Sequence, residues 1–406
     1  MPFEVPENWE WQKLGDIGVW QSGATPSRLN KDYYGGDIPW LKTGDLNDGF
    51  IYEIPETITQ KALEETSVRL NPAGSVLIAM YGATIGKVGI LTFPATTNQA
   101  CCACVDYQGI DQLYLFYFLL SHKEEFIMLG GGGAQPNISK EKIVDTYVPV
   151  PPLLEQKRIV NAIEQWFNLI DSLETAKENL QTSIMQAKSK ILDLAIHGKL
   201  VPQDPNDEPA IELLKRINPK FTPCDNAHDA NQLPDSWCWT TLGDVCELVT
   251  GSTPSKLHPE YYGGDFPFYK PTDLDAGRHV NIPSEFLTDE GKNVSRIIPV
   301  GSTAICCIGS IGKCGYIEKE GTTNQQINTA VPSKSLSPLY LYYFCNSSYF
   351  IDELSADSSA ITISIVNKSK LSKMLISLPP YNEQLRIVAK IEEFFAVLDE
   401  IHRLIK

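Results

Sequence analysis

The sequence predicts an α+β protein in which two tandem copies of one domain are each followed by a long helix. Two observations predict this fold class. First, the chain of 406 residues repeats itself at an offset of about 228 residues. Second, each copy consists of short β-like runs separated by Gly, Pro and Asn, and then changes to the apolar spacing of a helix. We therefore expect two duplicated α/β domains separated by long antiparallel coiled-coil helices and related by a pseudo-twofold axis.

The repeat appears as motifs that recur in the same order in both halves. Gly-x-Thr-Pro-Ser stands at 23–27 and 251–255, and Tyr-Tyr-Gly-Gly-Asp-x-Pro stands at 33–39 and 261–267. Ile-Gly-Lys-x-Gly stands at 85–89 and 311–315, and Thr-Thr-Asn-Gln at 96–99 and 322–325. Pro-Pro-x-x-Glu-Gln-x-Arg-Ile-Val stands at 151–160 and 379–388. These matches indicate a tandem duplication.

The motifs and the composition divide the chain into five segments. We expect a first domain at 1–150, a long helix at 151–200, a linker at 201–233, a second domain at 234–378 and a short helix at 379–406. The linker is rich in proline and acidic residues, which favours an exposed connection. Within the domains, the apolar runs at 111–129 and 337–354 each predict one helix.

The two long helices carry an apolar seam with alternating steps of four and three residues, which is typical of a coiled coil. The seam residues are Ile159, Ile163, Trp166, Ile170 and Leu173 in the first helix and Ile387, Ile391, Phe394, Leu398 and Ile401 in the second. A helix with such a seam exposed to water is unstable alone, so we expect the two helices to pair with each other. Antiparallel pairing would place one domain at each end of a rod.

Composition excludes several classes of protein. The apolar content of 43% is ordinary for a globular chain, and the apolar runs are shorter than the roughly 20 residues of a membrane span. The N-terminal residues do not resemble a signal peptide, so we expect a cytoplasmic protein without membrane contact. The ten cysteines sit mostly in apolar or strand-like runs and the six histidines are scattered, which favours buried thiols and no metal site. The net charge of −16 argues by itself against a nucleic-acid partner.

Segments that imitate catalytic signatures lack the groups that their chemistry needs. Leu378-Pro379-Pro380-Tyr381 resembles the tetrapeptide of amino-methyltransferases, but Leu378 replaces the Asn or Asp that accepts a hydrogen bond from the target amine. The glycines before Lys87 lack the Walker spacing and the Ser or Thr that holds magnesium. We therefore expect no catalytic residues in this chain.

At the level of whole segments, the sequence resembles the DNA specificity subunits of type I restriction-modification systems. The resemblance covers essentially the whole chain. It is carried by Tyr-Tyr-Gly-Gly-Asp-Ile-Pro-Trp-Leu-Lys-Thr-Gly-Asp-Leu at 33–46, by Thr-Asn-Gln at 97–99 and by Ile-Leu-Asp-Leu-Ala-Ile-His-Gly-Lys-Leu-Val-Pro-Gln at 191–203. It implies two target-recognition domains, each of which reads one half of a split, asymmetric site in double-stranded DNA.

The resemblance also implies partners and a division of labour. The helices would set the gap between the half-sites and dock two methyltransferase subunits, and restriction subunits would join in the full complex. S-adenosylmethionine, ATP and magnesium would then be needed only by the partner subunits, so we expect no cofactor here. Because partners can neutralise much of the phosphate charge, the acidity of the chain is compatible with this function.

The duplication sorts the candidate DNA-binding residues by a physical argument. Residues shared by two domains that read different half-sites cannot encode the difference, so they serve the fold or contact phosphates. Residues that differ between equivalent loops are candidates for reading bases. The DNA-binding candidates are Lys42, Thr43, Tyr81, Thr84, Lys87, Asn98 and Gln99 in the first domain and Lys270, Thr272, Ser310, Lys313, Asn324 and Gln325 in the second.

These candidates differ in the role that we expect of them and in the alternative to that role. The four lysines are candidates for phosphate contacts, with ordinary solvated lysines as the alternative. The possible base readers in the first domain are Tyr81, Thr84 and the 133–137 loop. The matching candidates in the second domain are Ser310 and the 358–362 loop. The shared Asn-Gln pairs have base-reading chemistry, but a structural role is the alternative that their identity in both copies favours.

A rival hypothesis from another class is an assembly scaffold whose two domains bind only protein and whose acidity excludes DNA. A stand-alone DNA-modifying enzyme is a further alternative that the missing cofactor and acceptor motifs disfavour. Co-purification with a methyltransferase, together with methylation at a split site, would separate the three.

Overall fold

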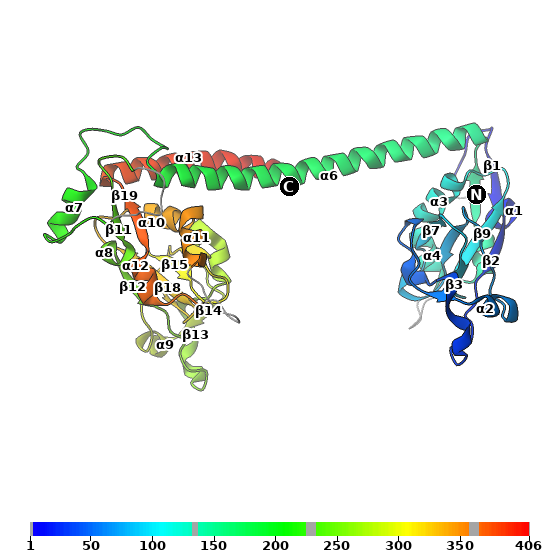
Figure 1. Ribbon diagram of the computed structural model, residues 1–406, viewed down its shortest axis with the longest axis horizontal. Coiled ribbons are helices and arrows are strands. Elements are labelled where there is room, and N and C mark those ends of the chain that lie inside the picture. The colour runs from blue at the N-terminus through cyan, green and yellow to red at the C-terminus, as the bar shows by residue number, and fades with distance from the viewer. Residues whose placement is uncertain (1–2, 132–136, 225–232, 357–364, 406) are drawn as a thin grey trace. The chain divides into compact units, whose positions relative to one another are not determined.

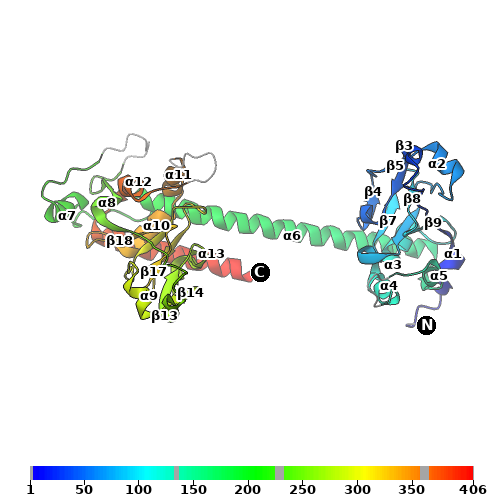
Figure 2. The ribbon, with the colours of Figure 1, turned by 90° about the horizontal axis from the view of Figure 1, so that it is seen from below.

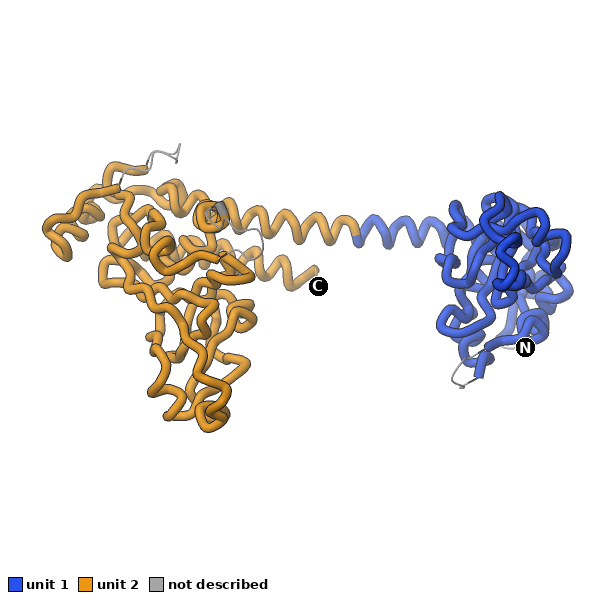
Figure 3. The backbone as a smooth tube through the Cα atoms, turned by 60° about the horizontal axis from the view of Figure 1, so that its bottom comes forward, with its two compact units in different colours: residues 1–174 blue, residues 175–406 orange. Residues whose placement is uncertain are grey.

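The computed structural model describes residues 3–131, 137–224, 233–356 and 365–405 (Figure 1). It divides into two compact units, residues 1–174 and 175–406 (Figure 3). Each unit holds one copy of the duplicated domain, as the repeat predicts. No helix among the described residues is both long and apolar enough to cross a membrane.

The first unit is built around a five-stranded sheet in the order β2-β9-β6-β7-β4. Its strands up to the central helices are β1 (Glu10–Lys13), β2 (Gly18–Ser22), β3 (Tyr34–Leu41), β4 (Gly49–Ile51), β5 (Thr57–Ile58), β6 (Val76–Ala79), β7 (Val88–Leu91), β8 (Thr96–Thr97) and β9 (Cys101–Tyr107). A small sheet, β5-β3-β8, stands beside it, and β1 pairs antiparallel with β10 (Tyr147–Val150). The helices are α1 (Leu14–Ile17), α2 (Gln60–Glu65), α3 (Gln112–Ser121), α4 (Lys123–Leu129) and α5 (Lys140–Val144), with short 3-10 turns η1 (Lys31–Tyr33), η2 (Thr43–Asp45) and η3 (Gly82–Thr84).

Strand β6 lies at the centre of this unit and is buried on both faces. Its side chains alternate, because successive residues of a strand point to opposite faces of the sheet. Val76 and Ile78 pack in the cluster that contains α3, whereas Leu77 and Ala79 pack with Cys101 on the other face. This alternation gives the domain a core on each side of one sheet.

The second unit repeats this topology. Its sheets have the orders β12-β18-β15-β16, β14-β13-β17 and β11-β19. The strands are β11 (Cys238–Thr241), β12 (Cys246–Thr250), β13 (Tyr262–Tyr269), β14 (Glu285–Leu287), β15 (Thr303–Cys306), β16 (Cys314–Tyr316), β17 (Thr322–Thr323), β18 (Ile327–Pro332) and β19 (Leu375–Leu378). The helices and 3-10 turns are α7 (Ala210–Ile217), α8 (Leu242–Val245), η4 (Pro259–Tyr261), η5 (Asp273–His279), α9 (Asp289–Asn293), α10 (Pro338–Cys345), α11 (Ser348–Ala356) and α12 (Lys368–Lys373). Where the first domain has β4, the second has a single bridge between Val280 and Ile317.

The two long helices are α6 (Leu153–Ile196), with 44 residues, and α13 (Tyr381–Leu404), with 24. Within the second unit, the C-terminal part of α6 runs antiparallel to α13 (Figures 1 and 2). Lys188 of α6 forms an ion pair with Asp399 late in α13, whereas the carbonyl oxygen of Ile196, at the end of α6, accepts a hydrogen bond from Ser377, just before α13. The antiparallel direction therefore agrees with the prediction.

Two local predictions need correction. The helix expected at 111–129 is two helices, α3 and α4, and its counterpart is α10 and α11. In both copies a polar side chain competes with the backbone at the break, because His122 Nδ1 lies 3.0 Å from the carbonyl oxygen of Phe118 and Asn346 Nδ2 donates to that of Tyr342 at 2.8 Å.

The linker at 201–233 is not simply exposed, as its composition suggested. It contains α7, whose Ala210 and Leu214 are buried in the core of the second unit, and Phe221 is also buried there. The apolar face of α7 outweighs the acidic and proline-rich composition around it.

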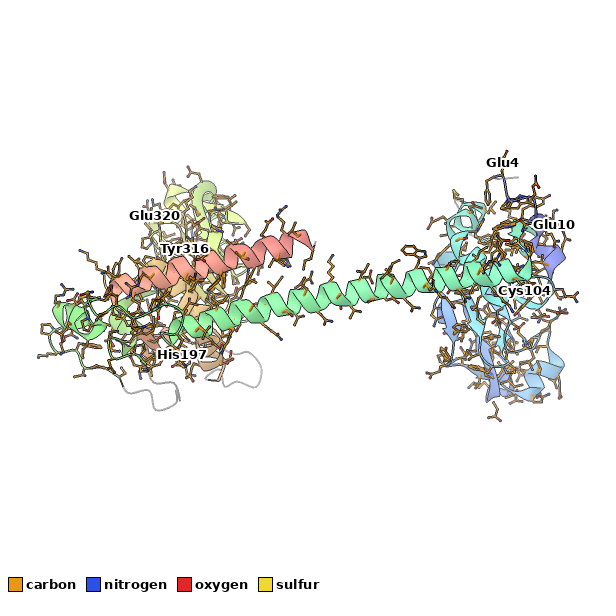
Figure 4. The ribbon with its side chains drawn as sticks, turned by 90° about the horizontal axis from the view of Figure 1, so that it is seen from above. Glu4, Glu10, Cys104, His197, Tyr316 and Glu320 are labelled. Carbon is orange, nitrogen blue, oxygen red and sulfur yellow. The ribbon has the colours of Figure 1, made fainter. Side chains whose placement is uncertain are left out.

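The cysteines follow the prediction, since nine of the ten are buried free thiols and Cys224 is half-buried. Cys104, one of the buried thiols, is labelled in the first unit in Figure 4.

Candidate nucleic-acid interface

A tight turn connects β6 to β7 in the first domain and β15 to β16 in the second, and it carries several of the predicted DNA-binding residues. In the first domain this turn lies between β6 and β7, and Gly82 and Gly86 adopt positive φ angles of 66° and 76°. In the second domain Gly309 and Gly312 do the same, with φ angles of 83° and 82°. Only glycine takes this conformation at low cost, so the shared glycines fix the same turn in both domains.

The residues of this turn that differ between the copies lie at the surface. Tyr81 is 39% exposed, and the Thr84 hydroxyl donates to the Tyr81 carbonyl oxygen at 2.9 Å. Ser310 is exposed at the equivalent turn. The hydroxyl groups of Tyr81 and Ser310 can both donate and accept hydrogen bonds, as base reading needs, whereas Thr84 has already donated its hydrogen.

A second chain segment lies against each turn. Tyr81 forms an isolated β-bridge with Asn137, and in the second domain Ile308 forms one with Ile365. In the first domain the structure thus brings together the two segments that the sequence singled out, and in the second domain the bridge lies two residues before Ser310 and three residues after the 358–362 loop. Apart from Asn137, the 133–137 and 358–362 loops themselves lie outside the described residues.

The four candidate phosphate-binding lysines differ in their electrostatic surroundings. Three are already paired with a carboxylate: Lys42 with Glu56 at 2.7 Å, Lys270 with Glu285 at 2.7 Å and Lys313 with Asp275 at 2.5 Å. Lys87 instead donates to the carbonyl oxygen of Leu46 at 3.4 Å and forms no ion pair in the described part of the chain. Lys87 is therefore the least neutralised of the four.

The ion pair of Lys42 also affects the pKa of its partner, the carboxyl group of Glu56. Glu56 accepts from both Arg28 and Lys42, and these two cations hold its pKa below the usual value. Lys42 and Lys270 each precede a short 3-10 turn, and their backbone N–H groups donate to Asp45 and Asp273. Thr43 is half-buried at the start of η2, and Thr272, which aligns with Gly44 in the repeat, is exposed just before η5.

The shared Asn-Gln pairs make hydrogen bonds inside their own domains. Gln99 accepts from the hydroxyl of Thr25, and Gln325 accepts from that of Thr253, so each binds the Gly-x-Thr-Pro-Ser motif of its domain. Asn324 exchanges two hydrogen bonds with Gln326, each 3.1 Å long. Asn98 Oδ1 is buried and has no hydrogen-bond partner among the described residues. Three of the four amides therefore have partners that a structural role would require.

The seam residues of the long helices fall into two groups. In α13, Ile387 and Ile391 are fully buried, Leu398 is half-buried, and Phe394 and Ile401 are 36% exposed. In the N-terminal half of α6, Ile159 and Ile163 are half-buried, and the later seam residues are more open: Trp166 is 65% exposed, Ile170 46% and Leu173 62%. The seam is thus buried at the start of α13, partly exposed further along α13, and largely open in this half of α6.

One exposed pair escaped the sequence analysis. Leu29 is 97% exposed, and Leu257, its counterpart in the repeat, is 90% exposed. Each follows a basic residue, Arg28 or Lys256, directly after the Pro-Ser of the shared motif. The repeat of Pro-Ser-(Arg or Lys)-Leu was the signal that would have found them, because an apolar residue that both copies leave in water has no role in the core.

No group of three or more His, Cys, Asp or Glu side chains in the described ranges is arranged to hold a metal ion. The interface consists instead of lysines, hydroxyls, amides and backbone turns, which bind by charge and hydrogen bonds.

Comparison with known proteins gives a single family. The family model described as "Type I restriction modification DNA specificity domain" matches twice, at residues 6–182 and 234–406. The MjaIX specificity subunit of Methanocaldococcus jannaschii is 25% identical over 93% of this chain and 84% of its own length. The EcoEI specificity subunit of Escherichia coli is 23% identical over 98% of this chain and 80% of its own length.

Solved structures show the same fold. A chain from a study of complex assembly and conformational transition of the type I R-M system matches with a TM-score of 0.65 and 18% identity, over 100% of this chain and 94% of that one. The HsdS subunit of Thermoanaerobacter tengcongensis matches with a TM-score of 0.61 and 19% identity, over 99% and 93%. The chain therefore belongs to the type I restriction-modification specificity subunits and carries two DNA specificity domains.

Proposed function

We propose that each domain reads one half of a split, asymmetric site in double-stranded DNA, while the long helices set the spacing and dock two methyltransferase subunits. The observation that carries this proposal is the duplication itself. The two domains share the order of their equivalent strands, with β4 alone replaced by a bridge, yet their equivalent turns carry different exposed residues, such as Tyr81 and Ser310. A shared frame with different surface residues is what two readers of different half-sites require.

The open seam supports a docking role for the helices. Apolar side chains such as Trp166 and Leu173 are exposed on the N-terminal half of α6, and aromatic residues of this kind are enriched where protein interfaces are buried. In this proposal the chain itself performs no chemistry. The methyltransferase and restriction subunits use S-adenosylmethionine, ATP and magnesium, and the chain delivers them to the DNA site.

Reconstitution with the methyltransferase subunits tests the proposal. We expect the complex to methylate a bipartite sequence, visible by single-molecule sequencing of DNA from a host that expresses both components. The chain alone should show no methyl transfer. Methylation at a continuous, undivided site, or methyl transfer by the purified chain without partners, would contradict the proposal. Absence of DNA binding by the assembled complex would favour the rival protein scaffold.

A further inference from the structure

Helix α12 of the second domain is a basic element in an acidic chain. It contains three lysines, Lys368, Lys370 and Lys373, and no acidic residue, whereas the whole chain has a net charge of −16. Lys368 and Lys373 are exposed, and neither forms an ion pair within the ranges that the structure describes. Helix α12 therefore adds positive charge to the surface of the second domain.

The matching stretch of the first domain, residues 139–145, is neutral, because two acidic residues balance its two lysines. At the position of Lys373 the first domain has Asp145, which forms an ion pair of 2.8 Å with Lys13. Thr241 takes the place of Lys13 in the second domain. The charge at this position thus changes from a neutral pair in the first domain to an ammonium group in the second.

The segment that leads into α12 is held against the turn between β15 and β16, which carries Ser310. The backbone N–H of Val366 donates to the carbonyl oxygen of Cys307 at 2.9 Å, and Ile365 forms the β-bridge with Ile308. Helix α12 begins two residues after these contacts. Its lysines therefore come from an element that is anchored beside this turn.

Buried contacts fix α12 on the domain. Leu371 is fully buried, and Asn367 caps the helix by accepting a hydrogen bond from the backbone N–H of Lys370 at 2.9 Å. A Cβ atom at Gly243 of α8 would come within 2.2 Å of the Ser372 hydroxyl oxygen, so the two helices are in close contact. Figure 1 shows α12 beside α8 and β12. The exposed lysines are thus presented from a fixed backbone.

The β15–β16 turn itself offers a neutralised lysine, since Lys313 is paired with Asp275 at 2.5 Å. The first domain has Asn47 at the position of Asp275, and its turn lysine, Lys87, forms no ion pair in the described part of the chain. A lysine without a carboxylate partner therefore stands on the turn in the first domain and on α12 in the second.

We propose that Lys368 and Lys373 bind phosphate groups of the DNA beside the half-site that the second domain reads. This inference rests on the proposed function, because it takes double-stranded DNA as the partner. Ammonium groups that give up no carboxylate are suited to phosphates, and such contacts position a protein on DNA without reading its sequence. Lysine is depleted at protein interfaces, so this surface fits a nucleic acid better than a partner subunit. In this arrangement α12 replaces the turn lysine as the phosphate-binding element of the second domain.

Salt-dependent DNA binding by the complex with the methyltransferase subunits tests the inference. Lys368→Gln and Lys373→Gln should each reduce the slope of log affinity against log salt by about 0.9, the value of one lost phosphate contact on B-DNA. Lys368→Arg and Lys373→Arg should keep the slope, because arginine retains the positive charge. Fluorescence anisotropy with a duplex that contains the methylated site gives the slopes. The methylated sequence, read by single-molecule sequencing, should be the same for all four variants.

Lys334→Gln is the matched control. Lys334 is also an exposed lysine of the second domain, but it lies away from the β15–β16 turn, in a segment whose Ser335 accepts a hydrogen bond from Gln384 of α13. The same loss of charge at this position should leave the slope unchanged.

Three results would overturn the inference. The first is an unchanged slope for both glutamine variants in a complex that still methylates its split site. The second is an equal reduction of the slope by Lys334→Gln. The third is weaker assembly with the methyltransferase subunits at an unchanged slope, which would assign α12 to a protein partner. If the unaltered complex bound no DNA, the proposed function would be refuted and this inference with it.

Discussion

Lys87 and Lys313 occupy equivalent turns but carry different effective charges. Lys313 is neutralised by Asp275 at 2.5 Å, whereas Lys87 contacts only the carbonyl oxygen of Leu46. An unpaired ammonium group gains more from a phosphate, because it gives up no carboxylate to reach it. The two lysines that the sequence treats as identical are therefore expected to contribute unequally to DNA binding.

Lys87→Gln in the assembled complex should lower DNA affinity and reduce the slope of log affinity against log salt by about 0.9, the value of one lost phosphate contact on B-DNA. Lys313→Gln should reduce the slope by less. Fluorescence anisotropy with a duplex that contains the methylated site, measured over a range of salt concentrations, gives both slopes. An unaltered slope for Lys87→Gln would remove this residue from the phosphate contacts.

Leu29 and Leu257 invite a second test at this scale. Because both domains share them, we expect a contact that is independent of sequence, such as insertion of the apolar side chain into a groove or between base steps. Leu29→Ser and Leu257→Ser should change the free energy of unfolding by less than about 0.5 kcal/mol, as surface substitutions do. DNA affinity should fall about tenfold for each, since the complex then loses the burial of one leucine side chain.

Ile282→Ser is a suitable comparison for these variants, because Ile282 is 80% exposed but belongs to no shared motif. It should leave DNA affinity unchanged. If the two leucine variants bind as well as the unaltered chain, the exposed pair has no role at the DNA.

At the scale of elements, helix α13 carries a buried carboxyl group that makes its stability depend on pH. Burial raises the pKa of Glu383, and the hydrogen bonds from Trp237 and Gln203 oppose this rise only in part. The folded state therefore binds this proton more tightly than the unfolded chain does. The stability that the protonated group contributes is present at low pH and is lost as the pH rises through the folded pKa.

Glu383→Gln tests this sign. The free energy of unfolding of the unaltered chain, minus that of the variant, should be larger at pH 5 than at pH 7.5, because the unaltered chain is stabilised at the lower pH. Denaturant titrations at both values measure the difference. Glu400→Gln on the same helix should show the opposite trend, because Arg403 lowers the pKa of Glu400. If the stability differences of the two variants changed with pH in the same direction, the raised pKa of Glu383 would be contradicted.

At the scale of the whole molecule, each specificity domain has its own sheets and its own core clusters. We expect replacement of residues 1–150 by the equivalent domain of another specificity subunit to alter one half of the methylated site and to leave the other half and the spacer unchanged. Sequencing of methylated DNA from a host with the exchanged chain and the methyltransferase subunits provides the measurement. A change in both half-sites would show that the domains do not read independently.

The sequence by itself determined the duplication, the two kinds of element and the positions of the long helices, because repeats and apolar periodicity are local properties of the chain. It placed the start of α6 within two residues of the observed Leu153. It also named Tyr81 and the 133–137 loop together as possible base readers, and the structure adds that Tyr81 and Asn137 are bridged.

Only the tertiary structure decided which residues at matching positions of the repeat also have the same surroundings. The carboxylate beside Lys313 and the burial of α7 in the second unit both depend on contacts between residues far apart in the chain. The two domains look alike in sequence, because the repeat is seen by matching the residues of the two copies position by position. Their surroundings differ because 192–217 packs on the second domain, and periodicity within a segment does not specify which surface that segment covers.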